Sequence, residues 1–150
     1  MDDPASQNFD QTLVGILTDA IAHSNLSKRE VARKSGVHKD ALLSILHSKR
    51  PASVQEALSI FDATGMEPRT AIVLALIGED ELNLQWAATE MHPFLAGLIS
   101  ALPRALFEEL GEDIIEVKRR WGAGTARMIA KALAGHIAEL TRRETVFGLH

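Results

Sequence analysis

The segment 26–51 constrains the fold more than any other, because its residues fit two short helices joined by a tight turn. Ala32 lies where the first helix must pass close to the second, a place with no room for a longer side chain. Gly36 lies where the chain must turn sharply, ideally with a positive φ. The apolar contacts come from one stripe along each helix: Val31, Val37, Leu42 and Ile45. The opposite stripe remains free to contact another molecule: Lys28, Arg29, Lys39, Asp40, Leu43 and Ser44.

The same segment matches a known motif, Leu-Ser-Gln-x-x-Val/Leu-Ala-x-x-x-Gly-Val-Ser. The matching residues are Leu26, Ser27, Val31, Ala32, Gly36 and Val37. A small basic loop, a proline and an amphipathic helix follow, at Lys49, Arg50, Pro51 and 54–63. On these residues the chain resembles the Cro/repressor-like (XRE-type) helix-turn-helix family over about residues 9–77. His38 replaces the Ser or Thr that usually caps the second helix of the motif, and we expect this to weaken the cap by ~1 kcal/mol.

The resemblance implies a lambda-repressor-like domain that binds double-stranded DNA in a bacterial or phage setting. In that family the second short helix enters the major groove, so the base-reading candidates are Lys39, Asp40, Leu43 and Ser44. Lys39 could donate to guanine, Asp40 could accept from cytosine and Leu43 could contact a thymine methyl group. The phosphate-binding candidates lie at the start of the first short helix and in the loop after the second: Ser27, Lys28, His47, Lys49 and Arg50.

The charge of the chain is unevenly distributed. The formal net charge is −4, yet residues 25–51 hold seven Lys or Arg against two acids, a balance of +5. The other 123 residues hold nine basic and eighteen acidic residues, a balance of −9. Salt limits the reach of each charge to about 8–10 Å, so a basic segment on an acidic body can still approach phosphate.

The composition excludes several other classes of protein. The chain has no Cys, which excludes a disulfide framework, a zinc finger and thiol chemistry. Its acidic, polar start is unlike a secretory signal peptide, and its longest apolar runs are too short to span a bilayer, so we expect no membrane partner and a soluble, cytoplasmic protein. The six His residues are dispersed without metal-ligand spacing. We therefore expect no metal, no cofactor and no enzymatic activity, and the sequence does not indicate whether a small-molecule effector binds.

Helical periodicity runs along the whole chain, and no segment shows the sustained alternation of a strand. The expected fold class is therefore all-α. Asn8 or Asp10 is expected to cap a first helix that ends near His23. Ser53 and Glu56 form the pattern of a capping box at the start of a further helix.

The domain boundary is expected at Gly78, where the family resemblance ends and an acidic linker, 78–81, begins. Residues 1–78 would then form the helix-turn-helix DNA-binding domain, and 79–150 a helical dimerisation or regulatory region. Within that region we expect a helix over 79–90 and another that starts at Pro93. Pro103 either bends that second helix or divides it.

The last part of the chain carries apolar residues in helical phase from 114 to 140. One helix over 112–143 would be about 48 Å long, which a small body cannot cover alone. A pair of helices broken at 121–124 is the alternative, and the pattern does not decide between the two. A homodimer would cover this stripe, and its interface candidates are Ile114, Trp121, Met128 and Leu133.

These observations favour a sequence-specific, DNA-binding transcriptional regulator that acts as a homodimer. The alternative is a helical protein-interaction module, antitoxin-like or an adaptor, that retains the fold without reading DNA sequence. An enzyme is the least favoured class, because no catalytic constellation is present in the sequence.

Overall fold

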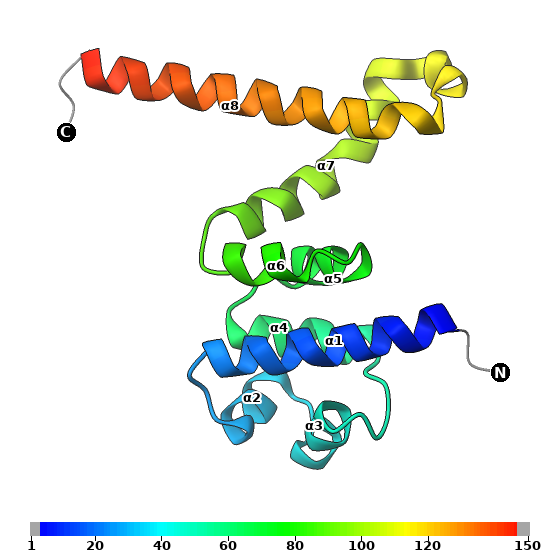
Figure 1. Cartoon of the computed structure of the whole chain (residues 1–150), viewed down its shortest axis with the longest axis vertical. Helices are drawn as coiled ribbons and strands as arrows, with labels where there is room; N and C mark the ends of the chain where they lie inside the picture. Colours follow the sequence, from blue (N-terminus) through cyan, green and yellow to red (C-terminus); the bar gives the residue numbers. More distant parts are fainter. Residues whose placement is uncertain (1–3, 147–150) are drawn as a thin grey trace. The chain divides into compact units, whose positions relative to one another are not determined.

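The computed structural model describes residues 4–146, and residues 1–3 and 147–150 lie outside that range. Within it every regular element is a helix, so the expected all-α class is confirmed. The α-helices are α1 Pro4–His23, α2 Lys28–Ser35, α3 Lys39–Leu46, α4 Val54–Thr64, α5 Pro68–Leu76, α6 Asp80–Trp86, α7 Met91–Leu110 and α8 Gly122–Val146 (Figure 1). Two short 3₁₀-helices, η1 Gly111–Glu116 and η2 Arg119–Trp121, precede α8. The chain forms two compact units, unit 1 up to Leu102 and unit 2 from Pro103 onward.

Unit 1 is built around one hydrophobic core to which α1 to α5 all contribute. α4 packs against α1, α2 and α5, and α2 packs against α3 (Figure 1). The side chains of Leu17, Val31, Leu42, Ile45 and Phe61 are completely buried in this core. Burial of each such side chain contributes roughly 1.5–3 kcal/mol, so α2 and α3 are held to the body of the unit by their apolar faces.

The helix ends of unit 1 follow local rules, with one exception. Ser53 and Glu56 form the expected capping box at the start of α4: the Ser53 hydroxyl accepts from the Glu56 N–H at 3.1 Å, and the Glu56 carboxylate accepts from the Ser53 N–H at 2.8 Å. α1 begins at Pro4 rather than at the expected caps Asn8 or Asp10, which lie inside the helix. Proline fits the first turn of a helix because no backbone partner is needed for its nitrogen there.

α6 and the first part of α7 also belong to unit 1, although the sequence suggested a boundary after Gly78. Three buried polar residues connect these helices to α5. The Thr70 hydroxyl donates to the His92 carbonyl at 2.5 Å, and the Asn83 side-chain amide donates to the Ala71 carbonyl at 2.8 Å. Nε2 of His92 lies 3.0 Å from the Asn83 carbonyl. The units therefore divide after Leu102, beyond this hydrogen-bonded cluster.

Unit 2 contains neither the single long helix expected over 112–143 nor two α-helices broken at 121–124. Its α-helix begins at Gly122, but the preceding segment is 3₁₀-helical and interrupted. Gly111 has a φ of +52°, and Val117 is extended with a ψ of 128°, so the α-helical path is lost at both positions. Pro103 lies inside α7, which continues through it and begins at Met91, two residues before Pro93.

No helix in the described part of the chain is long and apolar enough to cross a membrane.

Candidate nucleic-acid interface

The start of α2 is fixed by a capping box that the sequence analysis did not single out. The Ser27 hydroxyl accepts from the Glu30 N–H at 3.2 Å, and the Glu30 carboxylate accepts from the Ser27 N–H at 2.7 Å. These hydrogen bonds favour the charged carboxylate and lower the pKa of Glu30. The box determines where α2 begins, and it sets the exposed side chains of Lys28 and Arg29 in the first turn.

The turn between α2 and α3 has the geometry expected at Gly36. Its φ is +72°, and its N–H donates to the Ala32 carbonyl at 3.0 Å. The Ser35 hydroxyl accepts from the Val37 N–H at 3.2 Å. Ala32 and Val37 are buried, as expected. The chain therefore passes from α2 to α3 through a short turn closed by its own hydrogen bonds.

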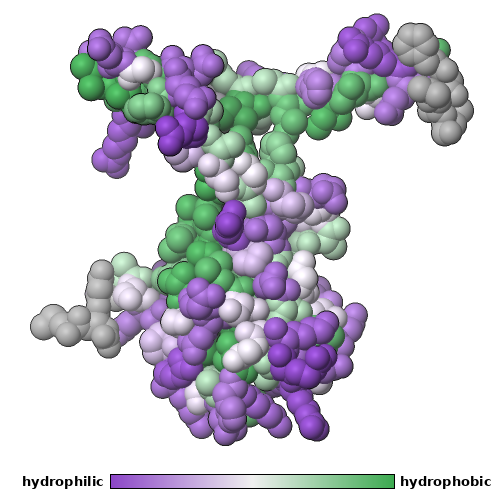
Figure 2. Space-filling view, turned by 180° about the vertical axis from the view of Figure 1, so that it is seen from behind, coloured by the Kyte–Doolittle hydropathy of each residue, from purple (hydrophilic) through white to green (hydrophobic). Residues whose placement is uncertain are grey.

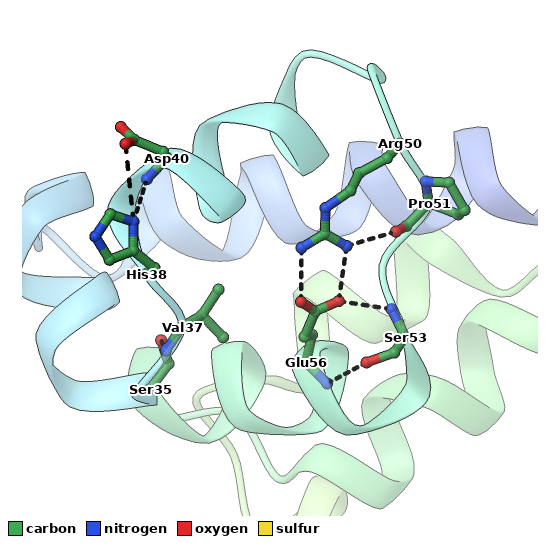
Figure 3. A network of polar contacts seen from close by, with 8 residues as sticks. All are labelled: Ser35, Val37, His38, Asp40, Arg50, Pro51, Ser53 and Glu56. Atoms are coloured by element: carbon green, nitrogen blue, oxygen red, sulfur yellow. Dashed lines mark hydrogen bonds and ion pairs between the residues drawn. The ribbon is translucent and has the colours of Figure 1, made fainter.

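α3 presents one face to the core and another to solvent. Leu42 and Ile45 are completely buried, whereas Lys39 and Asp40 in the first turn are exposed. His38 does cap the helix, because its Nδ1 accepts from the Asp40 N–H at 3.3 Å (Figure 3). The exposed side chains of the capping residue His38 and of Lys39 and Asp40 in the first turn thus lie at the N-terminal end of α3.

The four residues expected to read bases differ in accessibility. Lys39 and Asp40 are exposed at the surface. Leu43 and Ser44, one turn further along α3, are half-buried, so only part of each side chain can reach a ligand. Nδ1 of His38 lies 3.9 Å from the Asp40 carboxylate, and this pair carries opposite charges only when the imidazole is protonated.

The loop after α3 is held by Arg50. Its guanidinium forms two parallel bonds with the Glu56 carboxylate, of 2.7 and 3.1 Å, and a third with the Pro51 carbonyl at 3.1 Å (Figure 3). The hydrogen bonds from Arg50 and from the Ser53 N–H lower the pKa of Glu56 to about 2. Arg50 was expected to contact phosphate, but in the structure its guanidinium is bound within the chain. Lys49, beside it, is exposed.

Cations dominate the end of unit 1 that α2 and α3 form. In Figure 2 this end is covered mainly by hydrophilic residues. Its exposed basic side chains, none of which forms an ion pair with a described residue, are Lys28, Arg29, Arg33, Lys34, Lys39 and Lys49. Ser27 and His47, the other residues expected to contact phosphate, are also exposed. Two acids lie on these helices. The Glu30 carboxylate is bound in its capping box, and the Asp40 carboxylate forms no ion pair with a described lysine or arginine.

The residues expected at a dimer interface all lie in unit 2. Ile114 is in η1 and 47% exposed, Trp121 is in η2 and 48% exposed, and Met128 in α8 is 71% exposed. Leu133, also in α8, is half-buried.

Other chemistry is sparse in this structure. Within residues 4–146, no group of three or more His, Asp or Glu side chains is close enough together to hold a metal ion. Burial lowers the pKa of His92, which lies in the hydrogen-bonded cluster with Thr70 and Asn83. Sequence reasoning missed this cluster, since its members are 9 to 22 residues apart and share no motif spacing.

Comparison with protein-family models, with curated proteins and with solved structures found no match to this chain.

Proposed function

We propose that this chain is a sequence-specific DNA-binding regulator in which α2 and α3 form a helix-turn-helix and α3 enters the major groove. One observation carries the proposal. α3 is anchored by the completely buried Leu42 and Ile45, while Lys39 and Asp40 in its first turn are exposed among six cations without an ion-pair partner in the described chain. An anchored helix with an accessible N-terminal turn is what major-groove reading requires, because recognition helices contact base edges chiefly through their N-terminal residues.

Within this proposal the four residues have different roles. The Lys39 ammonium donates to O6 and N7 of guanine, and the Asp40 carboxylate accepts from N4 of cytosine. The half-buried Leu43 and Ser44 contribute smaller contacts, a thymine methyl group in the case of Leu43.

The phosphate contacts hold the protein without carrying sequence information. Lys28 at the start of α2 and Lys49 after α3 supply cations on either side of the recognition helix. The Ser27 hydroxyl accepts from Glu30 and keeps its own hydrogen for a phosphate oxygen. His47 lies beside Lys49 at the end of α3. Arg50 has a different role: its bonds to Glu56 order the loop that presents Lys49.

Substitution of single lysines tests the two kinds of contact. Sequence selection from random DNA, followed by fluorescence anisotropy on the selected site, measures preference and affinity. We expect Lys39→Ala to weaken binding to the preferred site by ~1–3 kcal/mol and to relax preference at one base pair. Lys28→Ala should weaken all DNA alike and lower the salt slope by about one.

Lys131→Ala is the matched control, because it removes one exposed lysine from α8, outside the proposed interface. Its affinity and its preference should equal those of the unmodified chain. If Lys39→Ala and Ser44→Ala both kept the sequence preference unchanged, α3 would not be the reading helix. If Lys28→Ala changed the preferred sequence and left the salt slope intact, its assignment to phosphate would be wrong.

A homodimer belongs to the same proposal, since two recognition helices about one DNA turn apart, ~34 Å, would read paired half-sites. A second candidate function is a helical protein-interaction module without DNA reading. It is favoured by unit 2, in which no described residue is buried. The DNA selection separates the two functions, because the interaction module would enrich no sequence.

A further inference from the structure

Unit 2 lacks a hydrophobic core of its own. None of its described residues, 103–146, is buried, and large apolar side chains remain open to solvent, among them Ile115 at 78%, Met128 at 71% and Phe107 at 61%. Most of the stability of a helix in a protein comes from packing of its apolar face rather than from the helix propensity of its residues. The 25 residues of α8 therefore need a surface to pack against.

Four large apolar side chains of α8 lie along one face. Ile129, Leu133, Ile137 and Leu140 follow one another at intervals of three or four residues, which is the spacing of a helical stripe. Figure 2 shows hydrophobic residues exposed along this helix. A stable dimer buries ~800 Å² on each partner, which corresponds to about 20–30 residues. Unit 2 has 44 described residues, enough to supply a contact of that size.

Two adjacent segments of unit 2 carry opposite charge. The acidic segment, 108–116, holds five carboxylates and no basic residue. The basic segment, 118–120, is Lys-Arg-Arg. In the described chain none of these charged side chains forms an ion pair, although only Val117 separates the two segments. The basic segment lines an open hollow of about 590 Å³, together with Ala123 in the first turn of α8, where the helix dipole adds positive potential.

We propose that unit 2 packs against unit 2 of a second copy of this chain, with the acidic segment of each copy on the basic segment of the other. A two-fold axis makes both contacts at once, because the same patch is used by both partners. The α8 stripes supply the apolar part of the interface, and the paired charges set its orientation. This inference deepens the homodimer of the proposed function and rests on it.

A second copy fits this surface better than a nucleic acid or an anionic membrane does. Both of those would be attracted by residues 118–120 and repelled by the five carboxylates of the neighbouring acidic segment. A second copy satisfies both segments and the apolar stripe. Partners that carry only negative charge leave the acidic segment unpaired.

Charge reversal in the full-length chain tests the inference. The acid-reversed variant carries Glu112→Lys, Asp113→Lys and Glu116→Lys, and the base-reversed variant carries Lys118→Glu, Arg119→Glu and Arg120→Glu. The control variant carries Asp19→Lys, Asp62→Lys and Glu90→Lys, three exposed acids of unit 1. It changes the net charge by the same amount as the acid-reversed variant and leaves unit 2 intact.

Sedimentation velocity measures the mass of each protein at tens of micromolar, and native mass spectrometry identifies which chains associate. The unmodified chain and the control should have twice the 16.4 kDa chain mass. Each reversed variant alone should associate at least ~10-fold more weakly, since like charges then face each other across the axis. An equimolar mixture of the two reversed variants should form a heterodimer as tightly as the unmodified chain forms its homodimer.

Three results would overturn the inference: a monomeric unmodified chain, reversed variants that dimerise as well as it does, or a mixture that yields no heterodimer. Reversal that abolishes binding to DNA or to phosphatidylserine vesicles by a monomeric chain would assign the hollow to those partners instead. The proposed function fails separately. A chain that pairs as described yet selects no DNA sequence refutes DNA reading alone, and a monomer that selects a sequence refutes only the pairing.

Discussion

The ion pair between Arg50 and Glu56 makes the loop after α3 sensitive to a single atom change, Glu56→Gln. Glutamine has nearly the same shape and can still accept from the Ser53 N–H, so the capping box of α4 survives. The charge that attracts Arg50 is lost. We therefore expect the substitution to lower the free energy of unfolding of unit 1 and to release the loop that carries Lys49.

The pKa of Glu56 and the exposure of the pair together set the size of this loss. Lowering the pKa from 4.5 to about 2 corresponds to an upper bound of ~3 kcal/mol. The Arg50 and Glu56 side chains are 40% and 25% exposed, so solvent screens their attraction. Exposed pairs are worth ~0.2–1 kcal/mol, and good bidentate geometry lies at the upper end of that range. We expect Glu56→Gln to cost about 1 kcal/mol near neutral pH.

The effect should depend on pH in a defined direction. Because the pKa of Glu56 is lowered on folding, the stabilisation is complete above the unfolded-state value of 4.5 and is lost as the pH falls toward 2. Urea unfolding in a Trp121→Phe background, followed by the fluorescence of Trp86 in α6, reports unit 1. The difference in unfolding free energy between the Glu56→Gln variant and the same background without that substitution should shrink steadily between pH 5 and pH 2.5.

Glu30→Gln is the matched control, since Glu30 occupies the same capping position in α2 and forms no ion pair with a described residue. Glu30→Gln should lower the free energy of unfolding less than Glu56→Gln does. The reasoning fails if, at neutral pH, the Glu56→Gln variant is as stable as the Trp121→Phe background without that substitution. It also fails if the difference between the two proteins is the same at pH 3 as at pH 7.

Two further predictions concern other parts of unit 1. Gly36→Ala should lower the free energy of unfolding, measured in urea, by about 1 kcal/mol, because alanine is strained at a φ of +72° although its Cβ would meet no other atom within 4 Å. Gly36→Asn should lower it less, because asparagine adopts a positive φ more readily. Equal losses for the two variants would contradict this account. Burial lowers the pKa of His92, so the unfolded chain binds the proton more readily, and the free energy of unfolding should fall as the pH drops from about 7 to 5.5. Unfolding of His92→Gln over that interval should show a smaller fall, and an identical fall would mean that other groups cause it.

Local features of the fold were predictable from neighbouring residues. The positive φ at Gly36 and the capping box of Ser53 and Glu56 depend on interactions within four residues, and both were expected. The ion pair between Glu56 and Arg50 was not expected from the sequence. Arg50 lies six residues away across an irregular loop, and no periodic pattern relates the two.

Contacts between distant residues were beyond the sequence patterns. Asn83 lies in the amphipathic segment of α6 and looks like an ordinary surface residue, yet it is completely buried and its side-chain amide donates to the Ala71 carbonyl. Contacts of this kind also join α6 and the first part of α7 to unit 1, whereas the sequence suggested a boundary after Gly78. Periodicity placed the apolar residues of 114–140 in one helical phase without revealing the 3₁₀ segment, because such a pattern does not report a break in the backbone such as the extended Val117.

If α3 reads DNA as proposed, its eight residues limit how much sequence information one chain can extract. At 1.5 Å per residue the helix is ~12 Å long, and with base pairs ~3.4 Å apart it faces only three or four of them. With four distinguishable base pairs, such a site recurs by chance about once in every 64 to 256 base pairs. For two copies on paired half-sites, the combined site recurs by chance about once in every 4,000 to 65,000 base pairs. Such a site is still frequent in a chromosome of ~10⁶ base pairs or more. The number of chains bound side by side, more than the chemistry of any one α3, would then decide which loci are occupied.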